Sequence, residues 1–250
     1  MSSFLGHRRK SHRFAAGGGG IPRDNLIAEY LFAADATDTS GSATTHNATL
    51  VGDASVSAGV VSLDGTGDYL TVADSTDLEF TDGAGTDEAF SFSLWFKSTV
   101  AVSAQNFIDK GNVPDTNARE YQFQTLGGGN AGKLALTIYN DTSGSANYIY
   151  AIGATAYTIN TWHHAVVTYD GSGAGTGIEL YFDGSNDTAT QAGVGTYTGM
   201  AGSTQGLAIG ARYSNTYGIF FTGDMDNVRI YKDKVLTASE VTELFNEGHS

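Results

Sequence analysis

The fold is decided near the C-terminus, in the stretch Phe221–Phe245 with the sequence FTGDMDNVRIYKDKVLTASEVTELF. Its first half lies within Phe220–Tyr231, which is predicted to hold the last strands. The second half contains Thr237–Glu240, a capping box in which the threonine hydroxyl and the glutamate carboxylate satisfy free backbone N–H groups. The apolar residues that follow lie on one helical face, so we predict a short helix that ends at Gly248.

Upstream of this stretch, short apolar segments recur between turns rich in glycine, asparagine and aspartate. Phe90–Phe96 alternates apolar residues with serine over its first half, which is typical of a half-buried strand. Val60–Asp64 and Tyr69–Val72 flank the turn Gly65–Asp68 and predict a hairpin. Further strands are predicted at Leu26–Phe32, Tyr121–Leu126, Lys133–Tyr139, Asn147–Ile152, Trp162–Tyr169, Ile178–Phe182 and Leu207–Ala211. Many strands with one helix favour a sandwich over βαβ units.

The order of these segments resembles that of laminin-G-like jelly rolls. AEYLF, LDGTGDYLTV, FSLWFK, WHHAVVTYDG, IELYFDG and the final strand and helix follow one another over about Asn25–Gly248. The resemblance implies an all-β, two-sheet antiparallel jelly-roll sandwich of the concanavalin A-like lectin/glucanase superfamily, with a short C-terminal helix. This fold hosts lectins, adhesins, hydrolases and structural modules, so it does not define a function by itself.

The N-terminus differs in character from the rest of the chain. We expect residues 1–24 to form an extended arm and residues 25–250 to form the sandwich domain. The arm contains the basic cluster Arg8, Arg9, Lys10 and Arg13, followed by the flexible joint Gly17–Gly20. It lacks the apolar segment of about 7–15 residues that a secretion signal needs. We interpret the basic cluster as an assembly anchor that a partner holds in place.

Composition narrows the range of partners and chemistries. The formal net charge is −14, and the arm contributes basic residues only, so the remaining body is even more acidic and is not expected to bind nucleic acid. The absence of cysteine excludes thiol catalysis and disulfides. No run of about 18 apolar residues occurs, so no membrane insertion is expected.

The acidic residues do not follow a glycosidase pattern. Relatives of the laminarinase type place acids on one strand as Glu-x-Asp-x-x-Glu, because the two carboxyl groups must lie about 5 Å apart on the same face. No such run occurs here: Glu179 is alone on its strand, and Asp87 and Glu88 are adjacent. A serine-hydrolase elbow Gly-x-Ser-x-Gly is also missing. We therefore predict that the chain is not an enzyme.

The segment WHH belongs to a predicted core strand. His163 and His164 are adjacent and would point to opposite faces of the sheet, so they cannot hold a metal together. One is expected to pack or to form a hydrogen bond, and the other to lie at the surface. Trp95 and Trp162 lie in strand patterns and are expected in the core.

Calcium is the metal that the resemblance suggests, since related sandwiches often carry a calcium ion near the chain ends. The matching positions are Asp38 and Asp226, with Asp224 close by. Calcium needs six to eight oxygen ligands, so these residues would have to converge from distant segments. The alternative is that Asp38 makes an Asx-turn and Asp226 binds neighbouring backbone.

Tyrosines in predicted loops are candidates for carbohydrate binding. The stretch from Arg212 to Tyr217, with Tyr213 and Asn215, combines two rings with an arginine and an amide, and Tyr197 lies upstream. A protein–protein interface uses exposed tyrosine equally well, so both interpretations stay open. The other tyrosines expected in loops are Tyr148, Tyr150 and Tyr157.

These observations lead to three hypotheses. The first is a non-enzymatic structural or adhesive protein of a bacteriophage virion, such as a capsid decoration or fibre protein. It would be a homo-oligomer that binds other virion proteins through the arm and displays a sandwich able to bind glycans. The alternative is a free or cell-surface bacterial carbohydrate-binding lectin module. The third is a diverged glucanase.

Overall fold

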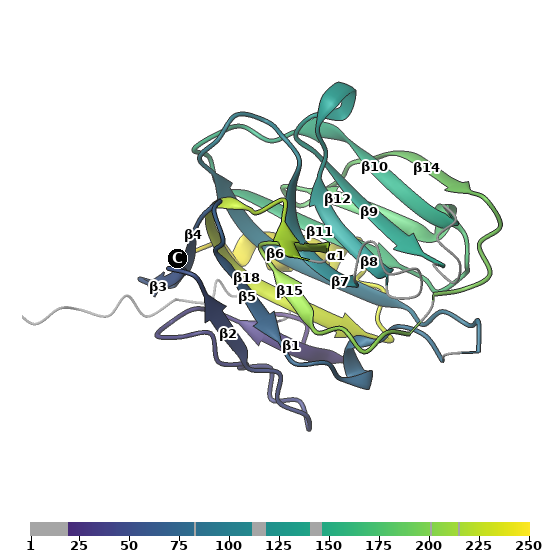
Figure 1. Cartoon of the computed structure of the whole chain (residues 1–250), viewed down its shortest axis with the longest axis horizontal. Coiled ribbons are helices and arrows are strands. Elements are labelled where there is room, and N and C mark those ends of the chain that lie inside the picture. Colours follow the sequence, from purple (N-terminus) through teal and green to yellow (C-terminus); the bar gives the residue numbers. More distant parts are fainter. Residues whose placement is uncertain (1–19, 83, 112–118, 141–146, 201, 215) are drawn as a thin grey trace, which may run out of the picture.

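The computed structural model describes residues 20–82, 84–111, 119–140, 147–200, 202–214 and 216–250. Within these residues, two eight-stranded antiparallel sheets stack face to face (Figure 1). Large apolar side chains from both sheets fill the space between them. The predicted all-β sandwich with one short C-terminal helix is confirmed. Ring centroids of Phe80 and Phe90 lie 4.4 Å apart at the centre of this core.

We call the first sheet sheet A. Its strands follow the order β13, β12, β11, β6, β18, β4, β3, and β1 also pairs with β18. Their bounds are β13 Ser185–Asn186, β12 Ile178–Phe182, β11 His163–Tyr169, β6 Phe90–Ser98, β18 Thr222–Lys232, β4 Val60–Asp64, β3 Ser55–Ser57 and β1 Leu26–Tyr30. One edge of β18 is shared by β4 and then β1, and Asn227, with φ 50°, occupies the bulge between them.

The second sheet, sheet B, follows the order β14, β10, β9, β8, β7, β15, β5, β2. Its strands are β14 Thr188–Val194, β10 Tyr148–Ala156, β9 Lys133–Tyr139, β8 Arg119–Thr125, β7 Gln105–Gly111, β15 Leu207–Ile209, β5 Tyr69–Val72 and β2 Ala48–Val51. A separate hairpin pairs β16 Arg212–Ser214 with β17 Thr216–Gly218. Among the described residues, three short 3₁₀ helices lie in the connections: Thr76–Leu78, Gly128–Asn130 and Gly175–Gly177.

The predicted hairpin between β4 and β5 is wrong. Both strands have the predicted bounds, but β4 pairs in sheet A and β5 pairs in sheet B, so the turn between them carries the chain across the sandwich. Asp68 explains this turn. Its buried carboxylate accepts the backbone N–H of Asp53 at 2.8 Å and of Asp64 at 3.1 Å. The same turn residues would suit a hairpin, and only the pairing partners distinguish the two structures.

Helix α1, Ala238–Glu247, lies on the outer face of sheet A, behind that sheet in the view of Figure 1. The predicted capping box is present: the Thr237 hydroxyl accepts the N–H of Glu240 at 3.3 Å, and the Glu240 carboxylate accepts the N–H of Thr237 at 2.8 Å. The apolar face of α1 packs against Val166 and Tyr231 of sheet A. None of the helices in the described residues has the length and apolar character to cross a membrane.

The described chain begins where the predicted arm meets the sandwich. The backbone carbonyl of Pro22 accepts a hydrogen bond from the buried Tyr231 hydroxyl at 3.1 Å, and Arg23 pairs with Glu29 at 3.0 Å. These contacts hold the end of the arm against sheet A. The proposed anchor residues Arg8, Arg9, Lys10 and Arg13 lie outside the described residues.

Candidate ligand-binding face

A row of tyrosines covers part of the outer face of sheet B. Alternate side chains of β9 and β10 point into the core, so Tyr139, Tyr148 and Tyr150 point away from it. Tyr139 and Tyr148 are cross-strand partners, and Tyr150 is two residues further along β10. Ring centroids of Tyr139 and Tyr148, and of Tyr148 and Tyr150, lie 5.8 Å apart in each case. We call this set the tyrosine row.

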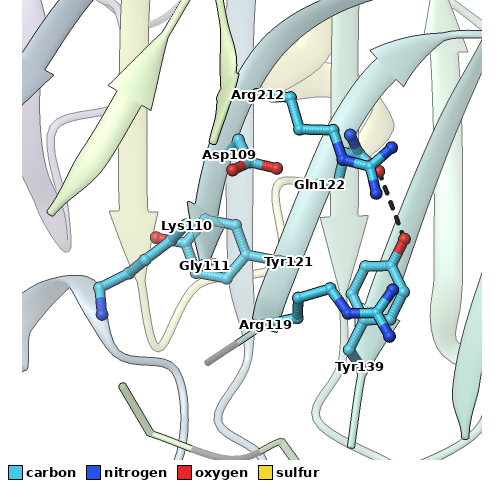
Figure 2. A pocket seen from close by; sticks show the side chains of 8 residues that line it. All are labelled: Asp109, Lys110, Gly111, Arg119, Tyr121, Gln122, Tyr139 and Arg212. Carbon is cyan, nitrogen blue, oxygen red and sulfur yellow. Dashed lines mark hydrogen bonds between the residues drawn. The ribbon is translucent and has the colours of Figure 1, made fainter. Parts of the chain in front are cut away.

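A shallow hollow, which encloses no space of the size of a water molecule, lies at the Tyr139 end of the row (Figure 2). Its lining comes from β7, β8, β9 and β16, and consists of Asp109, Lys110, Gly111, Arg119, Tyr121, Gln122, Tyr139 and Arg212. The Arg119 guanidinium lies over the Tyr139 ring, 4.4 Å from its centroid, in a cation–π contact. The Tyr139 hydroxyl donates to the Gln122 side-chain carbonyl at 3.3 Å. The ring is thus fixed from two sides.

Arg212 reaches over the same hollow from the first residue of β16, near Gln122 (Figure 2). Across the described part of the chain, no residue forms a hydrogen bond or ion pair with its guanidinium. Burial raises the pKa of Tyr139, and the charges of Arg212 and Arg119 lower it by less. The Tyr139 hydroxyl therefore stays protonated at neutral pH and keeps its role as a donor.

Lys110 faces the hollow only with its stem. Its ammonium nitrogen lies 2.6 Å from the Glu120 carboxylate and 3.2 Å from Asp74, and it is fully buried. The backbone N–H of Ser203 also donates to Glu120 at 2.8 Å. Burial raises the pKa of Glu120 to about 7, although Lys110 opposes the shift. This buried pair fixes the loop before β15, and its charges are not presented to a ligand.

The structure corrects the predicted loop Arg212–Tyr217. These residues form the hairpin of β16 and β17, in which Tyr213 and Tyr217 are cross-strand partners. Arg212 is brought to the hollow, as a binding role would need. Asn215 lies outside the described residues, as do the side chains of Tyr213 and Tyr217. Their proposed contacts with carbohydrate therefore stay predictions.

Tyr197 and the other predicted loop tyrosines have different surroundings. The Tyr197 hydroxyl donates to the Asp87 carboxylate at 2.6 Å, where the Tyr169 hydroxyl also donates at 2.6 Å. Asp87 thereby ties the segment around Tyr197 to the sandwich. Tyr157 is buried, whereas Tyr148 and Tyr150 lie on β10 rather than in a loop. The sequence predicted a strand at Asn147–Ile152, but it did not show that this strand lies beside Lys133–Tyr139. The tyrosine row was therefore not predicted.

The aspartates predicted to bind calcium do not come together. Asp38 accepts backbone N–H groups from its own loop, among them those of Ser40 at 2.8 Å and His46 at 2.9 Å. Asp226 accepts the N–H groups of Asn227 and Ser250, each at 2.6 Å. These contacts agree with the alternative that both carboxylates organise neighbouring backbone.

Asp224 is also engaged, with Lys97 at 2.6 Å and with the Ser62 hydroxyl at 2.7 Å. Among the described residues, one set of three acidic groups has ligand atoms within 4.8 Å of one another, and it is formed by Asp53, Asp64 and Asp68. Asp64 and Asp68 flank the turn between β4 and β5, and Asp53 lies in the turn between β2 and β3. Calcium binding stays a prediction, but Asp38, Asp224 and Asp226 do not come together to form a site for it.

The two histidines of β11 are both buried, so the prediction that one lies at the surface is wrong. His163 pairs with Asp183 at 2.9 Å, and His164 bonds the Ser93 hydroxyl at 3.0 Å. Burial lowers the pKa of His164 to about 3. The reason is α1, whose Phe245 ring lies 6.0 Å from the His164 ring and covers this face.

The same helix explains the tryptophans. Trp95 is buried as predicted, but it lies beneath α1, stacked 5.5 Å from Phe245, rather than between the sheets. Trp162 is only partly buried and stacks on His249 at 4.6 Å, so its assignment to the core is wrong. The sequence pattern identified strands, but it did not show which outer face a helix would cover.

Comparison with known proteins identifies the class to which this arrangement belongs. A family model described as the concanavalin A-like lectin/glucanases superfamily matches residues 64–242. The chain belongs to this family, as the laminin-G-like resemblance implied. No curated protein matches the chain.

Several solved structures share the fold. Domain 4 of an extracellular arabinanase from Geobacillus stearothermophilus, in complex with arabinotriose, is 19% identical, with a TM-score of 0.59 over 88% of this chain and 98% of that one. The binding domain of botulinum neurotoxin DC, in complex with rat synaptotagmin II, is 16% identical, with a TM-score of 0.60. A botulinum neurotoxin type C structure, described by its dependence on two ganglioside molecules for cell entry, gives the same values. Each of these two matches covers 90% of this chain and 52% of the toxin chain, so this chain spans about half the length of the toxin chains.

Proposed function

We propose that the chain is a non-enzymatic carbohydrate-binding module that holds a saccharide on the outer face of sheet B. The observation that carries the proposal is the tyrosine row, which ends at a polar hollow. Aromatic rings offer flat apolar surfaces, and the guanidinium group of Arg212 can donate hydrogen bonds to hydroxyl groups. A binding site typically combines apolar walls with a few placed polar groups in this way.

The structural relatives support the proposal at the level of fold. One of them is a domain in complex with arabinotriose, and another is described by its interaction with gangliosides. Those ligands belong to those proteins. For this chain, the argument rests on the tyrosine row and the hollow beside it.

The experiment that tests the proposal is binding of the full chain to a glycan array, followed by titration calorimetry with the best glycan. The double variant Tyr148→Ala/Tyr150→Ala is expected to lose at least about tenfold in affinity, because hot-spot aromatic residues contribute about 2 kcal/mol or more each. Tyr181→Ala, which removes a partly buried tyrosine from sheet A, is the matched control and should keep its affinity. Equal affinity of the double variant and the wild type would overturn the proposal.

The non-enzymatic part of the proposal rests on the acids near this face. Asp109 is the one acid among the described residues that line the hollow. Glu179 accepts hydrogen bonds from Asn186 and from Thr188, at 3.0 Å for the latter, and belongs to sheet A. Release of reducing sugar from β-glucans by the purified chain would contradict the proposal and favour a diverged glucanase.

We also propose, from the sequence, that the basic arm anchors the module in a larger assembly such as a virion. The test is the mass of the native particle that contains the full chain, compared with a chain that begins at Asn25. Entry of the full chain alone into a large complex would support the anchor. Monomers in both cases would leave a soluble or cell-surface lectin as the better description.

A further inference from the structure

The hollow at the end of the tyrosine row differs in charge from the rest of this acidic protein. The chain has a net charge of −14. Most of its cations in the described residues are paired with carboxylates, as in Arg23, Lys97, Lys110, Arg229, Lys232 and Lys234. Arg212 is different, because its guanidinium faces the hollow and has no hydrogen bond or ion pair with a described residue.

We infer that this hollow binds the carboxylate of an acidic saccharide, with Arg212 as the residue that receives it. The inference rests on the proposed function and names its ligand class. A guanidinium presents a planar fork of N–H donors that matches a carboxylate in a bidentate way. Gln122 and the Tyr139 hydroxyl lie beside Arg212, and Arg119 adds a second positive charge over the Tyr139 ring (Figure 2).

Opposing charges define the ligand more narrowly. Asp109 lines the same hollow, so a ligand bound to Arg212 also meets one carboxylate. The surface beyond the hollow belongs to a protein with a net charge of −14 and is acidic on balance. A densely sulfated polymer would meet that surface along its length. The arrangement therefore suits a saccharide with isolated carboxylates, such as a uronate or a sialic acid at a chain end.

The test uses the full chain on an array that carries neutral, uronate, sialylated and sulfated glycans. Titration calorimetry then compares the best carboxylated glycan with its neutral methyl ester. We expect the wild type to prefer the acid, and Arg212→Gln to lose about tenfold in affinity for the acid but not for the ester. Arg212→Lys keeps the charge without the fork and should fall between the two.

Lys133→Gln is the matched control. Lys133 lies on the same face of β9 as Tyr139, six residues away or about 20 Å along the strand, and the variant removes the same charge. Its affinity should stay within about twofold of wild type, since a long-range effect is screened. Equal losses for Lys133→Gln and Arg212→Gln would overturn the inference, because the whole-protein field would then be the cause.

The remaining outcomes separate the inference from the proposed function. A preference for uronate or for sialic acid identifies the source of the carboxylate, and either supports the inference. Binding to neutral glycans alone, equal affinity for acid and ester, or a preference for sulfated glycans would overturn it and leave carbohydrate binding standing. The absence of binding to every glycan would overturn both. Urea unfolding of each variant shows whether it is folded during the titration.

Discussion

Each outer face of the sandwich carries an arginine, and the two arginines have opposite surroundings. On sheet A, Arg229 is 1% exposed and is held by Glu29 at 2.9 Å and by Glu247 of α1 at 2.6 Å. On sheet B, Arg212 reaches over a hollow and forms no hydrogen bond or ion pair with a described residue. On sheet A, α1 covers the outer face, and its Glu247 pairs with the buried Arg229. The outer face of sheet B presents polar and aromatic groups to solvent.

Aromatic side chains follow the same division. Trp95 is buried under α1 against Phe245, whereas Tyr148 and Tyr150 remain partly exposed in a row. Burial of a side chain beneath a helix stabilises the fold, while an exposed aromatic row contributes little to stability and is available to a ligand. The comparison predicts that substitutions on sheet A change stability and those on sheet B change binding.

The largest effect is expected for Arg229→Met. It leaves Glu29 and Glu247 without their buried partner, and breaking such a pair costs about 3–5 kcal/mol. Arg212→Met should change the free energy of unfolding by less than about 0.5 kcal/mol, because no described residue depends on its charge. Urea unfolding at pH 7 measures both values. Similar losses of unfolding free energy in the two variants would contradict the difference between the two faces.

Trp95→Ala and Tyr148→Ala are expected to have opposite effects, the first mainly on stability and the second mainly on saccharide binding. The first should lower the free energy of unfolding by about 3–5 kcal/mol and leave saccharide affinity unchanged. The second should weaken saccharide binding with a smaller loss of stability, since its ring is partly exposed. Calorimetric titration and urea unfolding of both variants check this pair. Loss of affinity in Trp95→Ala, while folded, would contradict it.

Acid should destabilise the covered face through His164. Its folded pKa is lowered to about 3 from an ordinary value of 6.5, so the unfolded state binds a proton that the native state refuses. The free energy of unfolding should therefore fall as pH decreases from 6.5 toward 3. His164→Gln should show a smaller fall over this window in urea unfolding at a series of pH values. An unchanged pH dependence would show that another group is responsible.

The smallest effect is expected at the cap of α1. Thr237→Ala removes the hydroxyl that accepts the N–H of Glu240 and should cost about 1 kcal/mol. Thr242→Ala makes the same change at an exposed position inside the helix and should be neutral or stabilising, because alanine is a better helix former. The urea midpoints of the two variants measure the difference. Equal midpoints would mean that the cap does not help hold the helix on sheet A.

Strands with strong alternation could be predicted from the sequence, but their pairing could not. Val60–Asp64, Tyr69–Val72, Lys133–Tyr139 and Ile178–Phe182 have the predicted bounds. The turn between the first two crosses between the sheets because Asp68 is buried and accepts two backbone N–H groups. Strand β7 was missed altogether. Its sequence QNFIDKG carries polar residues that only the folded neighbours satisfy, so it shows no apolar period.

The residues of the candidate site could be predicted only in part, because a local sequence pattern does not show how strands pair. Arg212 was singled out from its aromatic and polar neighbours, and it does line the hollow. The outward phase of Lys133–Tyr139 could also have placed Tyr139 on the solvent face. Arg119 and Gln122 come from β8, and their position depends on the register of β8 with β7 and β9. No local pattern encodes that register.

The central claim is that the outer face of sheet B holds the saccharide. Hydrogen–deuterium exchange of the full chain, with and without the best glycan from the array, tests it directly. The account predicts added protection in β8, β9 and β10, within Arg119–Tyr139 and Tyr148–Ala156, and unchanged exchange in α1 and β11. Added protection confined to α1 or β11, with none in the sheet B strands, would contradict it.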